Sequence, residues 1–298
     1  MTTKNILERN QFSVSDEELQ SLISRYTRDI TDLDRQGRFD PISGRDAELD
    51  HMTLILLQRL RKNVMLLGNA GVGKTALFIG LAQLINQDKV PDLLKGATII
   101  ELEMSMIGAG SQSRADLEGR LIPIVKGVSE RNALRDRPPI IFCIDEIHQL
   151  MISFKASSYS GIADLLKPYL TEGLIYVIGA TTREEYQDYV TVEPAIDRRF
   201  QRIVLDMPDP ETTYHILLNM KANFEQHYRI AISDEACAYI VKLAERYIRN
   251  RTNPDKSILS LDQACARYVK KGLSDALDRA SIEEAIAGET GLDASAVR

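Results

Sequence analysis

The stretch that decides the fold runs from Val64 to Ala76 and reads Val-Met-Leu-Leu-Gly-Asn-Ala-Gly-Val-Gly-Lys-Thr-Ala. Its apolar first part, Val64 to Leu67, predicts a buried strand, and a helical pattern follows as far as Ile85. Between them, Gly68 to Thr75 match the phosphate-loop spacing Gly-x-x-x-x-Gly-Lys-Thr. The sequence therefore predicts a strand, a nucleotide-binding loop and a helix in succession, which is the start of an α/β domain.

Each residue type in this loop has a physical reason to be there. Glycines allow successive backbone N–H groups to curl around an anion, and the following helix directs its positive N-terminal end at the same phosphates. Lys74 can reach the β- and γ-phosphates, and the Thr75 hydroxyl can hold Mg²⁺. A glycine-rich turn with an incidental lysine would leave the flanking strand and helix unexplained. The candidate nucleotide-binding residues are Gly68, Asn69, Ala70, Gly71, Val72, Gly73, Lys74 and Thr75.

Two adjacent carboxylates follow a second apolar strand. Ile140 to Ile144 are apolar, and Asp145 and Glu146 come directly after them. Asp145 is a candidate magnesium ligand, and Glu146 is a candidate for polarising the attacking water. The alternative is a strand that ends in a solvated acidic turn, and the phosphate loop upstream makes this alternative the weaker one.

Threonines and arginines supply further candidates. Thr181 and Thr182 end a predicted strand, where a hydroxyl could hold water or the γ-phosphate. The alternative is a helix cap, and we favour that role for Thr181. Arg198 and Arg199 could reach a phosphoryl group, although their spacing alone fits a surface ion pair equally well.

Composition limits the functional class. The chain has 298 residues, of which 44% are hydrophobic, and a net charge of −6, so no global basic field indicates nucleic acid or an anionic membrane as a partner. No apolar run approaches the roughly 20 residues of a membrane helix. The three cysteines are far apart without metal-site spacing, and the N-terminus lacks a secretory signal. These features predict a soluble cytoplasmic protein.

Strand and helix patterns alternate as far as Leu205, and a Met-Pro-Asp-Pro segment then marks a boundary. The alternation predicts a mostly parallel sheet covered by helices on both faces. Only helical patterns follow, at about 211–228, 233–249, 255–271 and 281–288. We therefore expect a helical extension over 1–37, an α/β domain over 38–207 and a helical domain over 208–298.

Three helices expected before the boundary have defined limits. The first runs from Ser15 to about Leu33, and the second runs from about Asp46 to Arg61. A third helical pattern covers 114–128, where Pro123 is expected to cause a kink or a break.

These residues together resemble a known family. The chain is similar to the Clp-type AAA+ ATPases, and most closely to the first ATPase module of the double-ring unfoldases and disaggregases. The similarity spans roughly residues 24–271. The matching segments are 27–31, 40–46, 68–75, 142–148, 165–168, 179–182, 197–201 and 253–256.

The resemblance implies an α/β nucleotide-binding subdomain with a small helical lid, ATP and Mg²⁺ as ligands, and a ring of usually six subunits. It also implies nucleotide at each subunit boundary. Ile42 and Ser43 would flank the adenine, and Thr182 would be a polar sensor. Arg198 and Arg199 would be arginine fingers that reach the nucleotide of a neighbouring subunit.

The sequence also departs from the family. The family's substrate-gripping loop contains a Tyr, but residues 108–117 have no aromatic, and Ser113 stands where the Tyr belongs. Because rings grip extended polypeptides largely through aromatic and apolar contacts, efficient threading is not expected. Weak threading through a degenerate loop is the alternative. We also expect no N-terminal substrate domain, no coiled-coil insertion between Lys271 and Ser281, and no clear sensor arginine in the lid, where Leu259 replaces an Asp.

Three functions are therefore considered, and the first is favoured over the second. The first is an ATP-driven remodeller of protein assemblies that does not thread efficiently, with a protein substrate or partner complex. The second is a nucleotide-gated assembly or scaffold ATPase of a larger machine, such as a secretion or conjugation apparatus. The third, a fragment of an ordinary unfoldase, is disfavoured by the unusual loop.

Overall fold

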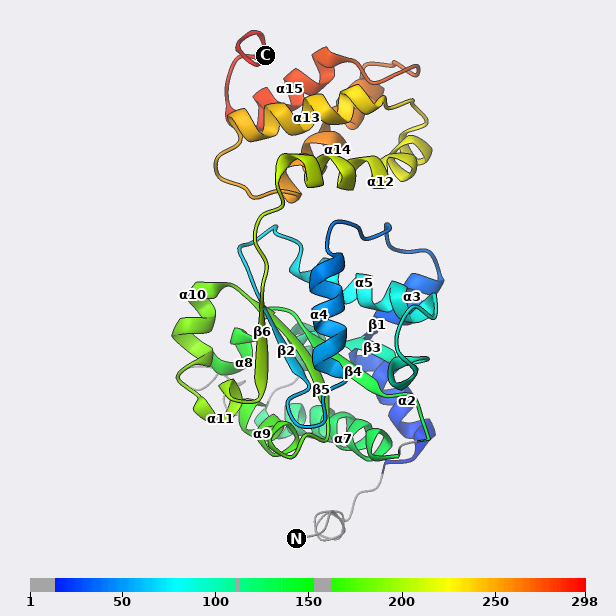
Figure 1. The fold of residues 1–298 in the computed structure, drawn as a ribbon, viewed down its shortest axis with the longest axis vertical. Helices are drawn as coiled ribbons and strands as arrows, with labels where there is room; N and C mark the ends of the chain where they lie inside the picture. The colour runs from blue at the N-terminus through cyan, green and yellow to red at the C-terminus, as the bar shows by residue number, and fades with distance from the viewer. Residues whose placement is uncertain (1–13, 111–112, 135, 153–161) are drawn as a thin grey trace. The chain divides into compact units, whose positions relative to one another are not determined.

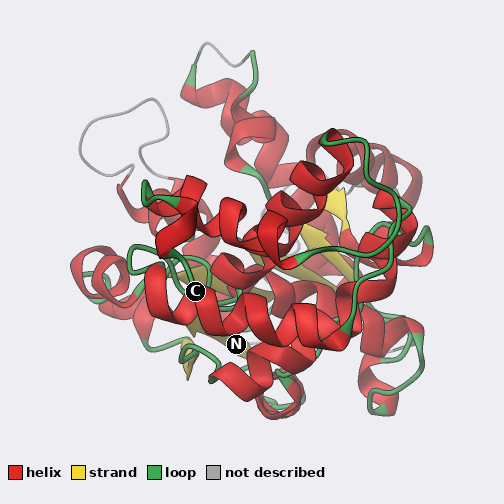
Figure 2. Cartoon of the chain, turned by 90° about the horizontal axis from the view of Figure 1, so that it is seen from above, coloured by secondary structure: helices red, strands yellow, loops and turns green. Residues whose placement is uncertain are grey.

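A computed structural model describes residues 14–110, 113–134, 136–152 and 162–298 of the chain. The chain packs as two compact units, each assembled from segments that are far apart in sequence. The first unit contains the described residues as far as 36, together with those of 50–67 and 81–203, and the second contains 37–49, 68–80 and 204–298. Helices outweigh strands in the chain, as the red and yellow of Figure 2 show.

The first unit is built on a six-stranded sheet with the strand order β1-β3-β4-β5-β2-β6 (Figure 1). Its strands are β1 (Arg28–Asp29), β2 (Asn63–Leu67), β3 (Thr98–Glu101), β4 (Ile140–Ile144), β5 (Tyr176–Thr181) and β6 (Phe200–Val204). The central pairs β3/β4, β4/β5 and β5/β2 are parallel, and β1 runs antiparallel to β3 at the edge. The predicted α/β class with a mostly parallel sheet is therefore confirmed.

The sheet is buried on both faces. Met65 and Phe142 belong to a core that also contains Leu121 and Ile124 of the long helix α7 (Arg114–Ala133). The residues that alternate with them along β2 and β4 are equally buried. Continuous apolar strands of this kind are typical of a parallel sheet with helices on both sides.

The helices that precede the second unit's bundle differ from expectation at three points. The predicted helix from Ser15 to Leu33 is interrupted, because Arg28 leaves it to pair in β1 and forms an ion pair of 3.0 Å with Glu101. The helix expected from Asp46 ends at Leu56 instead of Arg61. Pro123, where a kink or a break was expected, lies inside a continuous α7.

The remaining helices before the bundle are α2 (Asp16–Tyr26), α3 (Ile30–Arg35), α4 (Asp46–Leu56), α5 (Lys74–Asn86), η1 (Asp92–Leu94), α6 (Met104–Gly108), α8 (His148–Ile152), α9 (Ile162–Glu172), α10 (Arg183–Glu185), η2 (Tyr186–Val190) and α11 (Pro194–Asp197).

The second unit contains a bundle of four helices that share one apolar core. They are α12 (Pro210–Tyr228), α13 (Asp234–Tyr247), α14 (Asp255–Lys270) and α15 (Arg279–Thr290), followed by the short helix η3 (Ala294–Ala296). Buried residues from all four helices meet in this core, including Leu217, Ile240, Leu261 and Ile286. All four helical patterns expected after the Met-Pro-Asp-Pro segment are therefore confirmed.

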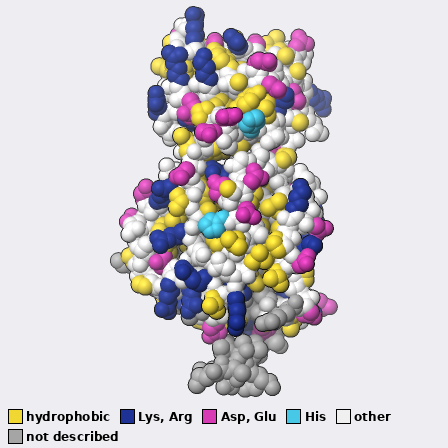
Figure 3. Space-filling model, viewed as in Figure 1, with side chains coloured by type: hydrophobic (Ala, Val, Ile, Leu, Met, Phe, Trp, Pro, Cys, Tyr) yellow, Lys and Arg dark blue, Asp and Glu magenta, His cyan; other side chains and the backbone are white. Residues whose placement is uncertain are grey.

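Charged side chains of both signs are distributed over the face drawn in Figure 3. Dark-blue and magenta atoms occur on it side by side, which agrees with the small net charge of −6. Among the described residues, no helix combines the length and the apolar character that crossing a bilayer requires.

Candidate functional site

The phosphate loop adopts the unusual backbone that its glycines predict. Gly71 and Gly73 have φ angles of +77° and +99°, in the region that residues with a Cβ rarely enter. Helix α5 begins at Lys74, immediately after the loop. The buried Lys74 side chain turns back, and its Nζ donates to the carbonyl oxygens of Gly68 at 2.8 Å and Asn69 at 3.1 Å. The loop therefore closes around its own lysine.

Gly71 also lies against the helical bundle within the same unit. A Cβ built on Gly71 would lie 2.8 Å from Cβ of Asp255, which is closer than two non-bonded carbon atoms approach each other. Gly71 is thus required both by its backbone angle and by the space around it.

We expect Gly71→Ala to lower both stability and ATP affinity. Gly272 is a matched control, because it has the same φ of +77° and a Cβ there would meet nothing within 4 Å. Gly272→Ala should cost about 1–2 kcal/mol for the left-handed backbone alone, and Gly71→Ala should cost more. Urea unfolding and nucleotide titration of both variants measure the difference. Equal stability of the two variants would contradict the crowding at Asp255.

A cavity of about 310 Å³ adjoins the loop within the second unit. Ile42 and Ser43, the candidate adenine-flanking residues, line it together with Val72 and Gly73 of the loop. The cavity has a largely apolar wall, as base-binding sites commonly have. The Ser43 Oγ is buried and has no hydrogen-bond partner among the described residues. The full lining is Arg38, Phe39, Asp40, Pro41, Ile42, Ser43, Arg45, Val72, Gly73, Ala76, Ile79, Ile216, Met220, Pro254 and Ile258.

Arg45 joins the candidate adenine segment to the phosphate loop, a role that sequence reasoning missed. Its guanidinium donates to the carbonyl oxygens of Val72 at 2.8 Å and Asp206 at 3.0 Å, and pairs with Glu48 at 2.6 Å. The side chain is buried, so these charge-assisted bonds replace its hydration. The sequence did contain one indication of a role for Arg45, because the residue lies in a segment, 40–46, that carries the family resemblance. That segment alone does not say which groups the Arg45 side chain contacts.

Asp145 and Glu146 follow β4 at the carboxyl edge of the sheet. Neighbouring β5 is parallel to β4, so Thr181 at its end belongs to the same edge. The backbone of Glu146 has φ of +50°, which is uncommon for a residue other than glycine. The Glu146 side chain is 44% exposed. Strained backbone at a half-exposed carboxylate is a feature found at functional sites.

The helix cap at the end of β5 is Thr182, not Thr181. Thr182 caps α10, since its Oγ1 accepts from Glu185 N at 3.2 Å and its N donates to Glu185 Oε2 at 3.1 Å. Thr181 is fully buried and donates its hydroxyl to Glu185 Oε2 at 2.9 Å. The cap role expected for Thr181 was wrong, because α10 begins at Arg183, so its N-cap is Thr182, while Thr181 is the last residue of β5.

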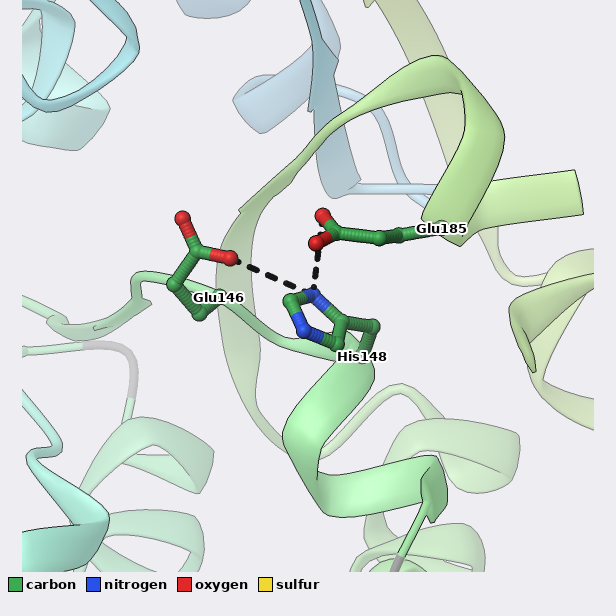
Figure 4. A group of neighbouring side chains, drawn as sticks. All are labelled: Glu146, His148 and Glu185. Atoms are coloured by element: carbon green, nitrogen blue, oxygen red, sulfur yellow. Dashed lines mark ion pairs between the residues drawn. The ribbon is translucent and has the colours of Figure 1, made fainter. Parts of the chain in front are cut away.

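His148 lies between two carboxylates (Figure 4). Its Nδ1 is 3.4 Å from Glu146 Oε2, 3.2 Å from Glu185 Oε2 and 2.9 Å from Thr181 Oγ1. Burial raises the pKa of Glu185, but the hydrogen bonds from Thr182 and Thr181 outweigh it, so the pKa lies below its ordinary value. Sequence reasoning did not single out His148 or Glu185, although His148 lies in a segment that carries the resemblance.

The two candidate finger arginines differ in exposure. Arg198 is exposed at the end of α11, and Arg199 is partly buried, with a buried Nε that has no hydrogen-bond partner among the described residues. Neighbouring Asp197 accepts instead from the hydroxyl of Tyr186. Within the described ranges, the surface ion pair considered for these arginines finds no partner.

Ser113, which stands in the candidate substrate loop, is the N-cap of α7. Its Oγ accepts from Asp116 N at 3.2 Å, and its N donates to Asp116 Oδ2 at 3.0 Å. Residues 111–112 of this loop lie outside the described residues. The side chain at this position therefore makes a local capping box.

Two family models match the chain in succession. The model described as "ATPase family associated with various cellular activities (AAA)" matches residues 64–206, and the model described as "AAA lid domain" matches residues 209–291. The first match contains the phosphate loop and the acidic pair, and the second contains the helical bundle.

Similar proteins and structures agree with these matches. "Chaperone protein ClpB" of Aquifex aeolicus is 39% identical over 270 residues, which are 91% of this chain and 26% of ClpB. ClpB of Staphylococcus epidermidis is 40% identical over 244 residues, which are 82% of this chain and 28% of that ClpB. A closed-state reconstruction of Hsp104 with ATPγS and FITC casein has a TM-score of 0.82 at 35% identity and covers 91% of this chain and 45% of that chain. The chain thus spans about a quarter of the ClpB relatives and less than half of Hsp104.

Proposed function

The chain belongs to the AAA family of ATPases, and we propose that it hydrolyses Mg·ATP to remodel protein assemblies. One observation carries this proposal most directly. The phosphate loop and the cavity beside Ile42 and Ser43 lie in one compact unit, and the buried Ser43 hydroxyl has no partner among the described residues. An apolar cavity with one free hydroxyl suits an adenine base, next to backbone amides that suit its phosphates.

Roles for the individual residues follow from chemistry and from the family. Ile42 and Ser43 contact adenine, and the loop from Gly68 to Thr75 holds the phosphates. Thr75 and Asp145 hold Mg²⁺, whose oxygen-ligand preference they meet and whose charge polarises the phosphates. Glu146 activates water, and Thr182 is the polar sensor. We retain 38–207 as the α/β domain and 208–298 as the lid.

We further propose a homo-oligomer, as a ring of six, in which Arg198 and Arg199 act in trans. Arg198 is exposed, and Arg199 carries an Nε without a hydrogen-bond partner among the described residues. Both side chains can therefore contact a phosphate of the nucleotide bound to a neighbouring subunit. A cytoplasmic location stays a prediction.

A protein substrate is the third part of the proposal. A related structure contains Hsp104 with casein. Ser113 is engaged as a helix cap and the neighbouring loop contains no aromatic residue, so we infer that this chain grips extended polypeptide poorly. The alternative, an assembly or scaffold ATPase of a larger machine, gains no support from the comparisons.

Casein offers a direct test of this inference. We expect ATP turnover of the purified protein to stay near its basal rate when casein is added. Ser113→Tyr should make turnover respond severalfold, because it restores an aromatic contact. Ser113→Ala is the matched control, since it also loses the cap, at a cost of about 1 kcal/mol, without gaining a ring. Strong stimulation of the unmodified protein by casein would contradict the inference, and absence of any ATP turnover would contradict the proposed function.

A further inference from the structure

We propose that His148 is a positioning residue for Glu146, holding one carboxylate oxygen so that the other can face the attacking water. The proposal rests on the hydrolytic function proposed above and extends it to a histidine with no role assigned so far. It is carried by a group of three side chains from three different elements, His148 of α8, Thr181 of β5 and Glu185 of α10. Figure 4 shows His148 and Glu185 beside Glu146.

The surroundings of the imidazole determine which ring nitrogen carries hydrogen. Nδ1 faces Thr181 Oγ1 at 2.9 Å, Glu185 Oε2 at 3.2 Å and Glu146 Oε2 at 3.4 Å. Ionised carboxylates only accept hydrogen bonds, and the Thr181 hydroxyl donates to Glu185. An unprotonated Nδ1 would point its lone pair at three oxygens, so Nδ1 carries hydrogen and acts as a donor.

The imidazole is also held by groups other than Glu146. Thr181 is fully buried in the sheet, and Glu185 Oε2 accepts both the Thr181 hydroxyl at 2.9 Å and Thr182 N at 3.1 Å. The main chain between Glu146 and His148 is also tied to the sheet, because Ile147 N donates to Ala180 O at 2.9 Å. His148 is itself buried, so the ring cannot turn freely.

Glu146 gains the most from such a contact. Its side chain is 44% exposed, and its backbone φ of +50° is unusual for a residue with a side chain. A general base works only when its oxygen is held within hydrogen-bond reach of the water. A fixed N–H beside Oε2 reduces the number of orientations that the Glu146 carboxylate can adopt. Less conformational entropy then has to be lost when the carboxylate is aligned with the water.

A cation site is the competing interpretation of this cluster. Glu146, His148 and Glu185 present possible ligand atoms that lie within 4.8 Å of one another. Nδ1, however, already has a hydrogen-bond partner in Thr181 Oγ1 at 2.9 Å, and its separations of 3.2 Å from Glu185 and 3.4 Å from Glu146 are those of close polar contacts between protein groups. A bound cation would also occupy the carboxylate that has to activate water. We therefore favour positioning, and zinc addition distinguishes the two.

The test compares two substitutions of His148. His148→Leu should lower kcat up to about tenfold, because the Glu146 carboxylate loses one polar contact of ordinary strength, and should leave KM and ATP affinity nearly unchanged. His148→Asn places an amide N–H close to the position of Nδ1 and should restore most of the rate. His51→Leu, at an exposed histidine of α4, is the matched control and should be silent. Circular dichroism and urea unfolding confirm that each variant is folded.

A double-mutant cycle tests whether the effect passes through Glu146. In a Glu146→Gln background, adding His148→Leu should change the rate of single-turnover hydrolysis very little. Additive losses, a changed KM, or a His148→Asn variant as slow as His148→Leu would overturn the proposal. Zinc that stimulates the unmodified protein would do so as well. If Glu146→Gln itself hydrolyses ATP normally, the proposed function fails instead.

Discussion

Glu146→Gln should lower ATP turnover by about 10²–10⁴-fold, because it removes the general base while keeping the shape of the side chain. ATP binding should be preserved, since no phosphate contact is assigned to this residue. The variant should therefore accumulate in its ATP-bound state and trap the oligomer. Steady-state turnover, nucleotide titration and analytical ultracentrifugation measure these three expectations.

Glu184→Gln is the matched control for this experiment. Glu184 is an exposed carboxylate of α10, close in sequence to Glu185 and without an assigned role. It should hydrolyse ATP at the normal rate. If Glu146→Gln also kept normal turnover, the catalytic role of Glu146 would be refuted.

Arg199→Ala should lower turnover by about 10³-fold or more, the range known for arginine fingers, without a large loss of ATP affinity. The reason is that the guanidinium would stabilise charge that develops on the phosphoryl group during transfer, not the bound nucleotide. Arg199→Lys should not rescue the rate, because an ammonium cannot reproduce the planar two-pronged contact. Arg198→Ala, assayed in parallel, shows which of the two arginines carries the larger effect.

A mixing experiment tests whether the arginine acts across subunits. Lys74→Ala should bind ATP poorly but still offer its arginines, and Arg199→Ala has an intact phosphate loop. Each variant alone should be inactive, and their mixture should recover activity if neighbouring subunits complete each other's sites. A mixture as inactive as its components would show that the arginine serves its own chain or none. Recovery also requires oligomerisation, which sedimentation of the same samples confirms.

Local sequence was sufficient for most elements of the fold. The phosphate loop, the apolar strands ending at Ile144 and near Thr181, and the four bundle helices were predicted, because each depends on residues within a few positions of one another. The helix expected from Ser15 to Leu33 failed for the opposite reason. Its interruption at Arg28 depends on pairing with Glu101, which is 73 residues away in the sequence.

What the sequence by itself determined is therefore the chemistry of the site: a loop for phosphates, a carboxylate pair after a strand, and the α/β class with its helical bundle. Only the tertiary structure decided which groups meet. Arg45 reaches Val72 and Asp206, and His148 meets Glu185, through contacts that no short-range pattern encodes. The physical reason is that strand register and the first residue of each helix decide which side chains come together. A difference of one residue is enough: Thr181 ends β5 instead of capping α10, and its hydroxyl therefore donates to the Glu185 carboxylate.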